Sequence, residues 1–490
     1  MGRFGSCCRL ELEEIDVNSR MYVCLLAAGG MVSSALGSLL EASSPSAPAS
    51  VDRIASSPPP MPQAGDYTIP TFENELINGG RRTVERYYGF PVEGRSWGGI
   101  TMDYHLSCPP GGCDPWDRSA TVYLITEDDL HIELARLITP YKKACSWSAD
   151  VTPYMPLLRG DVKLGIFIDT WVWEEGWQVT VDFTFHEGLL EPEPYRVEPL
   201  WRGSPEMGSY QAWLEGRGIN EDFFTPWTLG IPAEAVETEL RFSMTGHGQG
   251  NSRNAGEFIQ LGHWVEADGE TIASRVFWRD DCAENPCSPQ SGTWKYSRAG
   301  WCPGDVAPMW SVDLTPHIGG ADSVTVDYGL DEYVNYCSPA NPECDPDRDC
   351  MYWINSCDYD GGGHTPPSLW TESQVVYYRS NPLCDLALEI PAPPTTVESG
   401  ERVTVEVFAR NACAAPRSFD RAELAFEGRV SKRRILYEGP SLKLPAGARR
   451  GADVTTVIPA NTPPGDYSVT ISLLREEVEV GFASFPLTVE

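Results

Sequence analysis

At 490 residues the chain is too long for a single hydrophobic core, so its length favours about two to four domains. Hydrophobic residues at 41% and aromatic residues at 11% exclude a disordered chain. The formal net charge of −33 argues against nucleic acid as a partner, because affinity for phosphate requires clustered Lys and Arg. It suits a protein whose substrate is neutral or whose basic residues are gathered locally.

Residues 1–65 predict a leader followed by a disordered Ser/Pro linker. The apolar run from Met21 has the length of a signal-peptide core, and Ala47-Pro48-Ala49 offers a cleavage site. Translation that starts at Met21 would remove the acidic residues before it. A membrane anchor is the alternative, which the glycines and serines in the run disfavour. We expect a mature chain without a membrane span, secreted or held in the periplasm or at the cell surface.

Short alternating runs separated by Gly/Pro turns follow, and no long amphipathic helix is evident. This pattern predicts an all-β protein with β-sandwich or jelly-roll domains at residues 66–193 and 194–381. After residue 382 the chain lacks Trp and alternates again, which predicts an immunoglobulin-like β-sandwich over 382–490. The runs in the first two domains are Val122–Thr126, Glu133–Ile138, Val162–Ile168, Gln178–Phe185, Glu239–Met244, Phe258–Val265, Ser323–Tyr328 and Gln374–Tyr378.

Twelve of the fifteen cysteines lie beyond the leader, in loops rich in Pro, Gly and Asp. These spacings indicate disulfides formed in an oxidising compartment; zinc is the alternative, but the chain has no C-x-x-C pair. Cys384 and Cys413 are candidates for a disulfide in the last domain. The acidic insertion at 337–367 is expected to be a disulfide-stapled loop, with calcium binding as the alternative. The pairing of its cysteines and of Cys145 and Cys287 stays open.

The most informative stretch runs from Cys108 to Arg118. Two cysteines close a Pro/Gly turn and lead into Trp116, Asp117 and Arg118, just before an alternating run. A short disulfide loop would fix these side chains at the mouth of a strand, where a rigid scaffold can aim them. The alternative is a turn with a purely structural role, in which Asp117 only forms an ion pair with Arg118.

Six separated blocks, in the same order, resemble the peptide-N-glycosidase F family, secreted bacterial amidases that remove intact glycans from asparagine. The resemblance covers roughly residues 80–381 and implies two adjacent eight-stranded jelly rolls, a fold shared with copper type II ascorbate-dependent monooxygenases. The blocks are Cys113-Asp114-Pro115-Trp116-Asp117-Arg118, Leu137-Ile138-Thr139-Pro140-Tyr141, Asp169-Thr170-Trp171, Gly246-His247, Gly256-Glu257 and Arg298-Ala299-Gly300-Trp301-Cys302-Pro303-Gly304.

The resemblance implies three catalytic acids: Asp117 as the principal carboxylate, Glu257 as the second acid at the junction of the jelly rolls, and Asp169 in the place of a third. It also implies two disulfides, Cys108–Cys113 and Cys282–Cys302. The substrate-binding residues that it implies are Arg118, Trp171, His247, Arg298 and Trp301. The residues alone allow blander interpretations, in which Glu257 is a strand-edge charge and the tryptophans near residue 171 are core.

Two carboxylates in different surroundings suit amide hydrolysis, because they can divide the acid and base roles. An arginine beside them can keep one ionised while burial raises the pKa of the other. The expected function is therefore an exported amidase that hydrolyses the glycan–asparagine amide of N-linked glycoproteins or glycopeptides. We expect a monomer without a cofactor or a metal.

Two other functions stay open. One is a non-catalytic protein that binds glycans or surfaces, which three differences from the family favour. Asp169 is one methylene shorter than the usual glutamate, Thr245 replaces a tryptophan, and a cysteine pair is replaced by Asn254 and Ile259. The other is a copper monooxygenase, which needs clustered His and Met ligands, whereas the seven histidines contain no His-His or His-x-His pair.

Overall fold

The computed structural model describes residues 64–92, 96–248, 256–336, 341 and 366–490. The expected leader, most of the linker, most of the acidic insertion and Asn254 lie outside the described residues. The regular secondary structure of the described chain is almost all β, which confirms the all-β class. Its helices are short: η1(Thr152–Leu157), α1(Tyr210–Leu214), α2(Ile219–Asp222), η3(Cys282–Glu284) and α3(Thr315–Ile318). Within this part of the chain, no helix has the length and apolar character needed to cross a membrane.

The first β-sandwich combines strands that alternate between buried and less buried side chains with strands that are buried almost throughout, such as β5 and β6. Along β9(Trp177–Glu187), every second residue from Trp177 to Phe185 is buried. Its two sheets run in the orders β1(Tyr67–Pro70)-β9-β4(Trp97–Ser107)-β7(Cys145–Asp150), with β2(Glu75–Ile77) also on β9, and β15(Asp305–Val306)-β6(His131–Ile138)-β5(Ser119–Ile125)-β8(Gly160–Ile168)-β3(Thr83–Phe90).

The second β-sandwich has two sheets of four strands around a separate apolar core. The first pair of sheets has five strands each among the described residues, rather than the eight in all that the resemblance implied, because β2 and β15 are added at the edges. The sheets of the second sandwich are β10(Glu193–Gly203)-β18(Ser368–Arg379)-β12(Ala235–His247)-β16(Trp310–Asp313) and β11(Trp227–Gly230)-β17(Ser323–Leu330)-β13(Gly262–Ala267)-β14(Glu270–Val276).

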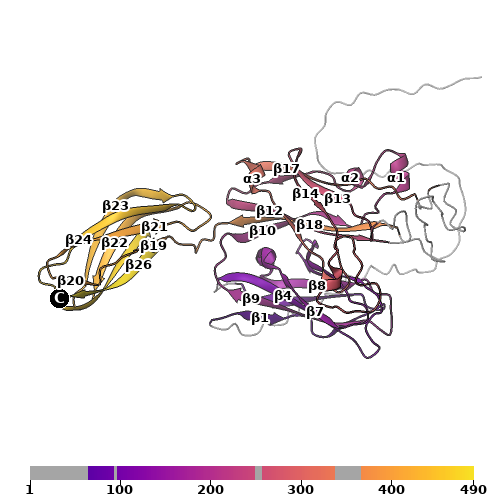
Figure 1. The fold of residues 1–490 in the computed structure, drawn as a ribbon, viewed down its shortest axis with the longest axis horizontal. Coiled ribbons are helices and arrows are strands. Elements are labelled where there is room, and N and C mark those ends of the chain that lie inside the picture. The colour runs from indigo at the N-terminus through magenta and orange to yellow at the C-terminus, as the bar shows by residue number, and fades with distance from the viewer. Residues whose placement is uncertain (1–63, 93–95, 249–255, 337–340, 342–365) are drawn as a thin grey trace, which may run out of the picture. The chain divides into compact units, whose positions relative to one another are not determined.

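The C-terminal strands, yellow in Figure 1, form a third pair of sheets with its own core. Cys384 and Cys413 are joined by a disulfide in this region. The domain boundaries in sequence stay a prediction. The sheets are β19(Ala387–Glu389)-β21(Arg402–Arg410)-β24(Arg449–Val457) and β20(Thr396–Val397)-β26(Val478–Val489)-β25(Gly465–Arg475)-β22(Arg417–Glu427)-β23(Lys432–Leu444).

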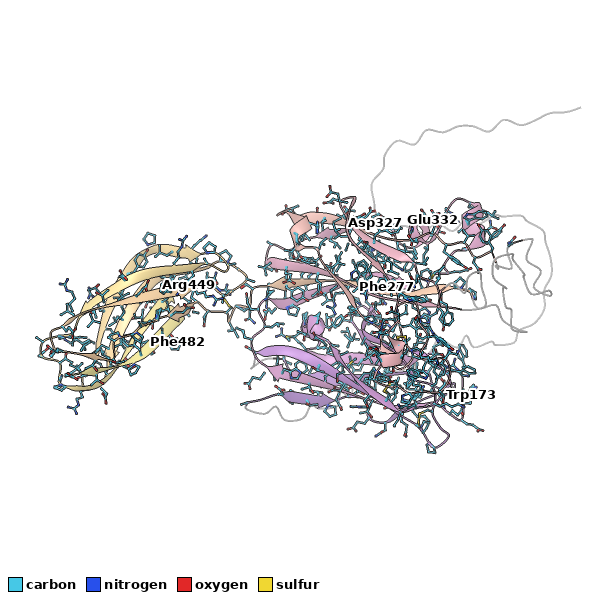
Figure 2. The ribbon with its side chains drawn as sticks, viewed as in Figure 1. Trp173, Phe277, Asp327, Glu332, Arg449 and Phe482 are labelled. Atoms are coloured by element: carbon cyan, nitrogen blue, oxygen red, sulfur yellow. A yellow bond between two sulfur atoms is a disulfide. The ribbon has the colours of Figure 1, made fainter. Side chains whose placement is uncertain are left out.

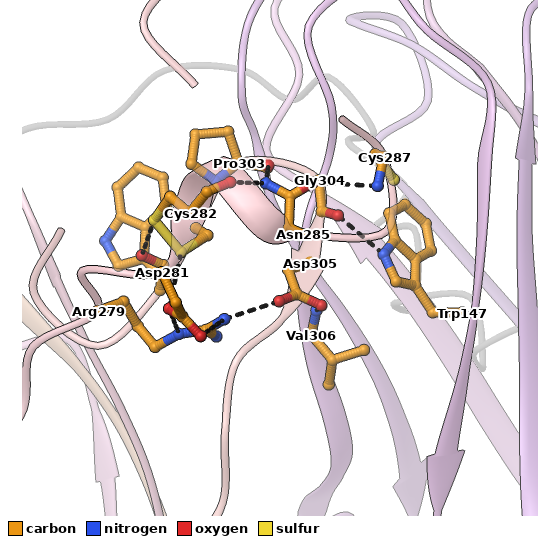
Figure 3. Close-up of polar contacts among 12 residues, drawn as sticks. Trp147, Arg279, Asp281, Cys282, Asn285, Cys287, Pro303, Gly304, Asp305 and Val306 are labelled. Carbon is orange, nitrogen blue, oxygen red and sulfur yellow. Dashed lines mark hydrogen bonds and ion pairs between the residues drawn. A yellow bond between two sulfur atoms is a disulfide. The ribbon is translucent and has the colours of Figure 1, made fainter. Parts of the chain in front are cut away.

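The loop over residues 277–307 fastens the second half of the chain to the first sandwich (Figure 3). Its strand β15 pairs with β6, and Trp147 Nε1 donates to the Gly304 carbonyl oxygen at 3.0 Å. Cys145 in β7 forms a disulfide with Cys287 in the loop, which settles a pairing that the sequence left open. Because these contacts join the loop to both sheets, through β6 and β7, the loop is held at a defined place on the first sandwich.

Two details of the sequence interpretation are wrong. The run Phe258–Val265 was expected to be a strand, but β13 begins only at Gly262, because Gly256 to Phe258 form a turn. The tryptophans near residue 171 do not share one environment. Trp177 is fully buried in the core, whereas Trp171 and Trp173 are exposed.

Replacement of Cys145 and Cys287 by serine should lower the free energy of unfolding by about 2–5 kcal/mol, because the disulfide restricts the unfolded chain. Calorimetry of the double variant beside the unchanged protein measures this loss. The Cys384→Ser, Cys413→Ser double variant is the matched control, which should leave the transition of the first two sandwiches in place. An equal loss in both variants would contradict a specific role for Cys145–Cys287.

Candidate active site

The site forms where three neighbouring strands of the first sandwich end at one edge of the sheet. Because β5 is antiparallel to both β6 and β8, the residues before β5 lie beside those after the other two strands. The Thr139 amide donates to the Arg118 carbonyl oxygen at 2.8 Å, and the Asp169 amide donates to the Ser119 carbonyl oxygen at 3.0 Å. The topology therefore brings Asp117 and Asp169 to the same sheet edge.

Asp114, which the sequence analysis did not assign, organises the turn before Asp117. Its carboxylate is fully buried, pairs with Arg118 Nε at 2.9 Å and accepts a hydrogen bond from the Trp116 amide at 2.9 Å. The Thr170 hydroxyl donates to it at 2.5 Å. The partner of Arg118 is thus Asp114, so the alternative of a simple Asp117–Arg118 pair is wrong.

A disulfide closes this turn. Cys108 is bonded to Cys113, and Gly176 exchanges backbone hydrogen bonds with Gly112 and Asp114. Position 111 must be glycine, because a Cβ there would lie 1.9 Å from the Glu174 carbonyl oxygen. The turn is therefore packed against the segment that follows Trp171 and Trp173.

Glu257 comes from the second sandwich and is held by close backbone packing. Its amide donates to the Gly248 carbonyl oxygen at 3.1 Å, and its carbonyl oxygen accepts from the Ala299 amide at 2.9 Å. A Cβ at Gly246 would lie 2.0 Å from the Gly256 carbonyl oxygen, and Gly256 itself has a φ of +87°. Both glycines are thus required to place Glu257.

Arg298 joins the two acids. Its side chain is 1% exposed, and two of its nitrogens face carboxyl groups: Nε lies 2.8 Å from Glu257 Oε1, and Nη2 lies 3.9 Å from Asp117 Oδ2. The guanidinium is also 4.5 Å from the ring centre of Phe258. Asp117 and Glu257, 140 positions apart in the sequence, therefore meet at one buried cation.

Burial sets the protonation of both acids. Desolvation raises the pKa of Glu257 to about 8, with a further contribution from the negative charge of Asp117 and against the opposing effect of Arg298. Desolvation also raises the pKa of Asp117, against a hydrogen bond from Tyr141 and the positive charge of Arg298. Each carboxyl side chain is 15% exposed, so water reaches both. Glu257 therefore holds its proton at neutral pH. Asp117 has more neighbouring groups than Glu257 that favour the ionised carboxylate.

Tyr141 is a second residue that sequence reasoning did not assign, although it stands in one of the quoted blocks. Its hydroxyl group hydrogen-bonds to Asp117 and lies 3.2 Å from the Thr293 hydroxyl oxygen. Thr293 also accepts from Arg298 Nη2 at 3.2 Å. The Tyr141 amide donates to Gln290 Oε1 at 3.0 Å, so the loop that carries Arg298 also fixes Tyr141.

Asp169 has a partner of its own. Its Oδ1 lies 3.0 Å from Arg82 Nη1, and the guanidinium of Arg82 stacks at 4.1 Å on the exposed ring of Trp171. The structure thus places Asp169 at the same sheet edge as Asp117 but in a separate ion pair.

His247 and Trp301, expected to bind substrate, contact each other and the backbone around Gly246. Trp301 is 3% exposed, its Nε1 donates to the Gly246 carbonyl oxygen at 2.7 Å, and its ring stacks on His247 at 5.4 Å. His247 Nε2 lies 2.8 Å from the Thr245 hydroxyl oxygen, and burial lowers the pKa of His247 to about 3. Trp301 is buried, whereas His247 is half-buried. The binding role expected for both residues stays a prediction.

Exposed aromatic rings lie in the chain segments that carry or adjoin these residues. Trp116, Trp171, Trp173 (labelled in Figure 2) and Tyr296 are between 55% and 73% exposed. Trp116 adjoins Asp117 in the chain, and the Tyr296 carbonyl oxygen accepts from Arg298 Nη1 at 2.9 Å. Large exposed aromatic faces suit the apolar faces of sugars.

Among the described residues, no three His, Cys, Asp or Glu side chains lie together in a way that could hold a metal ion. The described groups that meet at this site are two partly buried carboxyl groups, one guanidinium and one phenol. Cys282–Cys302 stands close by, bonded as the resemblance implied, in the loop that leads to Arg298.

The described structure is that of a protein with paired β-sandwiches in which two carboxyl groups face one arginine. Three comparisons bear on its class. The family model for the C-terminal domain of peptide-N-glycosidase F matches residues 219–357. Peptide-N(4)-(N-acetyl-β-D-glucosaminyl)asparagine amidase F of Elizabethkingia miricola is 26% identical over 305 residues, which cover 59% of this chain and 84% of that protein.

A solved structure agrees on the fold. The crystal structure of a peptide-N(4)-(N-acetyl-β-D-glucosaminyl)asparagine amidase superposes with a TM-score of 0.52 at 21% identity, covering 64% of this chain and 96% of that one. The family model and the amidase F relative confirm the resemblance to the peptide-N-glycosidase F family.

Asp114→Asn should lower the free energy of unfolding by about 3–5 kcal/mol, because it leaves Arg118 partly buried without its anion. Denaturant unfolding of the variant measures this loss. Asp222→Asn, which removes an exposed partner of Arg217, is the matched control and should cost less than about 1 kcal/mol. Equal losses would show that Asp114 has no special part in holding the turn.

Proposed function

We propose that this chain is a peptide-N-glycosidase-like amidase that hydrolyses the amide between an N-linked glycan and asparagine. The observation that carries the proposal is the meeting of Asp117 and Glu257 at Arg298. The 26% identity to an amidase of this activity supports the reaction class. The substrate is an N-linked glycoprotein or glycopeptide, whose sugars would lie on the exposed aromatic rings.

The proposed reaction divides its proton transfers between the two acids. Asp117 takes a proton from a water molecule, whose oxygen attacks the side-chain carbonyl carbon of the glycosylated asparagine. Glu257, protonated at neutral pH, gives its proton to the departing nitrogen as the carbon–nitrogen bond breaks. The first products are a neutral aspartic acid side chain and a glycosylamine, with the proton from water on Asp117 and Glu257 ionised. The new side chain then ionises to aspartate by giving its proton to water, and transfer of the proton on Asp117 to Glu257 through water restores both acids, so that atoms and charge balance.

Arg298 and Tyr141 would hold these acids in place. Arg298 stays positively charged throughout, so it stabilises the negative charge on Asp117 before the attack and on Glu257 after its proton has left. Tyr141 donates to Asp117 and orients it. Positioning of this kind contributes much of the rate in amide hydrolysis, because the uncatalysed reaction is slow.

A non-catalytic glycan-binding protein is the second candidate. It is favoured by Asp169, whose carboxylate is held by Arg82, and by Thr245, which is buried and accepts from Arg136 Nη1 at 2.9 Å where the family has a tryptophan. We further propose that the chain acts as a monomer and that it works outside the cytoplasm. The four disulfides among the described residues support this location, because disulfides persist in oxidising compartments.

The wild type should convert glycosylated asparagine in a denatured N-glycoprotein to aspartate and release the whole oligosaccharide. Asp117→Asn should lower this rate by about 10²–10⁴-fold, because the amide cannot accept the proton. Mass spectrometry of peptide and glycan measures both products, and circular dichroism checks the fold of the variant. A folded wild type that binds glycopeptide without turnover would support the second candidate instead.

The rate should fall as the pH rises through about 8, because Glu257 then loses the proton that it must donate. Its raised pKa keeps this proton bound at all lower pH values, so the loss lies on the alkaline side. Glu257→Gln should be slow at every pH and lack this alkaline decline. A wild-type rate that is constant from pH 7 to about 9 would contradict the assigned role.

A further inference from the structure

The C-terminal β-sandwich is open along one side. β23 is the edge strand of one sheet and β24 is the edge strand of the other. Between the sheets lies a cavity of about 650 Å³, within the range of roughly 300–1,000 Å³ that small-molecule sites occupy. The side chains that line its interior are apolar and come from both sheets: Leu388, Val407, Leu436, Leu444, Ile471 and Leu473.

Basic residues gather at the opening. Residues 429–450 contain seven Arg or Lys and a single acid, Glu438, in a chain whose net charge is −33. Arg434, Lys443 and Arg450 line the cavity. Lys443 and Arg450 are exposed, and within the part of the chain that the structure describes neither forms an ion pair. Three basic residues and one acid, Asp453, line the cavity, so the opening presents an excess of positive charge.

Three other charged residues lie at or near the opening: Arg434, Asp453 and Arg449. Arg434 Nη1 donates to the Thr455 carbonyl oxygen at 3.3 Å and so links β23 to β24. Asp453 is the one acid among the lining residues. Arg449, labelled in Figure 2, is already held by Glu389 at 3.0 Å and stacks on Phe408. An incoming anion would thus meet Lys443 and Arg450 first.

The shape of the cavity narrows the choice of ligand. Packed sheets lie about 10 Å apart, so the space between them is a thin slot that suits a linear chain. An added β-strand is disfavoured, because β23 carries Pro440 and an irregular register between Arg421/Glu438 and Phe419/Leu442, features that protect an edge against strand pairing. A slot with apolar walls and a cationic mouth fits an acyl chain that ends in an acid.

We propose that the C-terminal sandwich binds a long-chain fatty acid, with its hydrocarbon chain between the sheets and its carboxylate at Lys443 and Arg450. This site is separate from Asp117 and Glu257 and does not depend on the proposed amidase activity. Burial of each further methylene should raise the affinity by roughly fourfold at most. Affinity should therefore depend on both chain length and head-group charge.

Titration of the full chain with cis-parinaric acid, followed by its fluorescence, tests the proposal. Dodecanoate should compete at least tenfold better than octanoate and at least tenfold better than dodecanol. Lys443→Glu with Arg450→Glu should weaken binding at least tenfold. The control Lys432→Glu with Arg433→Glu makes the same charge change on β23 outside the cavity lining and should change affinity less than twofold.

A second variant tests the slot itself. Ala409→Phe places a ring among the lining residues and should abolish binding, while an unchanged thermal transition shows that the fold is kept. Equal competition by dodecanol, equal effects of the two charge variants, or unchanged binding in Ala409→Phe would each overturn the proposal. Sedimentation with phosphatidylglycerol vesicles in the absence of any fatty-acid binding would also overturn it, in favour of a bilayer surface.

Discussion

The buried guanidinium of Arg298 is the interaction on which the proposed chemistry depends. One cation faces two carboxyl groups that come from different sandwiches, and it is almost without contact with solvent. Two ionised acids at such a distance would repel each other, and burial would penalise both. The cation makes it possible to hold one of them ionised while the other keeps its proton. The difference between the two acids thus arises from their surroundings, since their chemistry is the same.

Arg298 in turn depends on contacts far from the acids. Its loop is fixed to the first sandwich by β15, by Cys145–Cys287 and by the hydrogen bond from Trp147 to Gly304. The position of Arg298 at the seam between the sandwiches is therefore set by strand pairing, a disulfide and a hydrogen bond to the backbone of its loop. A displacement of about 1 Å at such a site can cost two orders of magnitude in rate, which explains why so many constraints meet there.

Much of this architecture is predictable from the sequence, because period-two alternation identifies strands and the quoted blocks identify Asp117, Glu257 and Arg298. The limits are equally physical. Asp114 is an ordinary acid in sequence, and only its burial beneath Arg118 and Thr170 gives it a role, although its place inside the disulfide turn was a usable signal.

Exposure is what a sequence conveys least. Trp301 and Trp173 are the same residue type, yet Trp301 is buried and donates to the Gly246 backbone, whereas Trp173 is 73% exposed. The strand expected to begin at Phe258 begins at Gly262 instead. Gly256 has a positive φ and turns the chain, and the β-propensity of the residues after it does not predict such a turn. Tertiary packing decides such cases, and it becomes visible only when both sandwiches are in place.

Cys145–Cys287 also bears on when this arrangement can form during synthesis of the chain. The bond spans 142 positions, so it joins parts of the chain that are synthesised far apart in time. Asp117 comes from the first sandwich, whereas Glu257 and Arg298 come from the second half of the chain. These three groups can therefore meet only after residue 298 has left the ribosome and its loop has docked on the first sandwich.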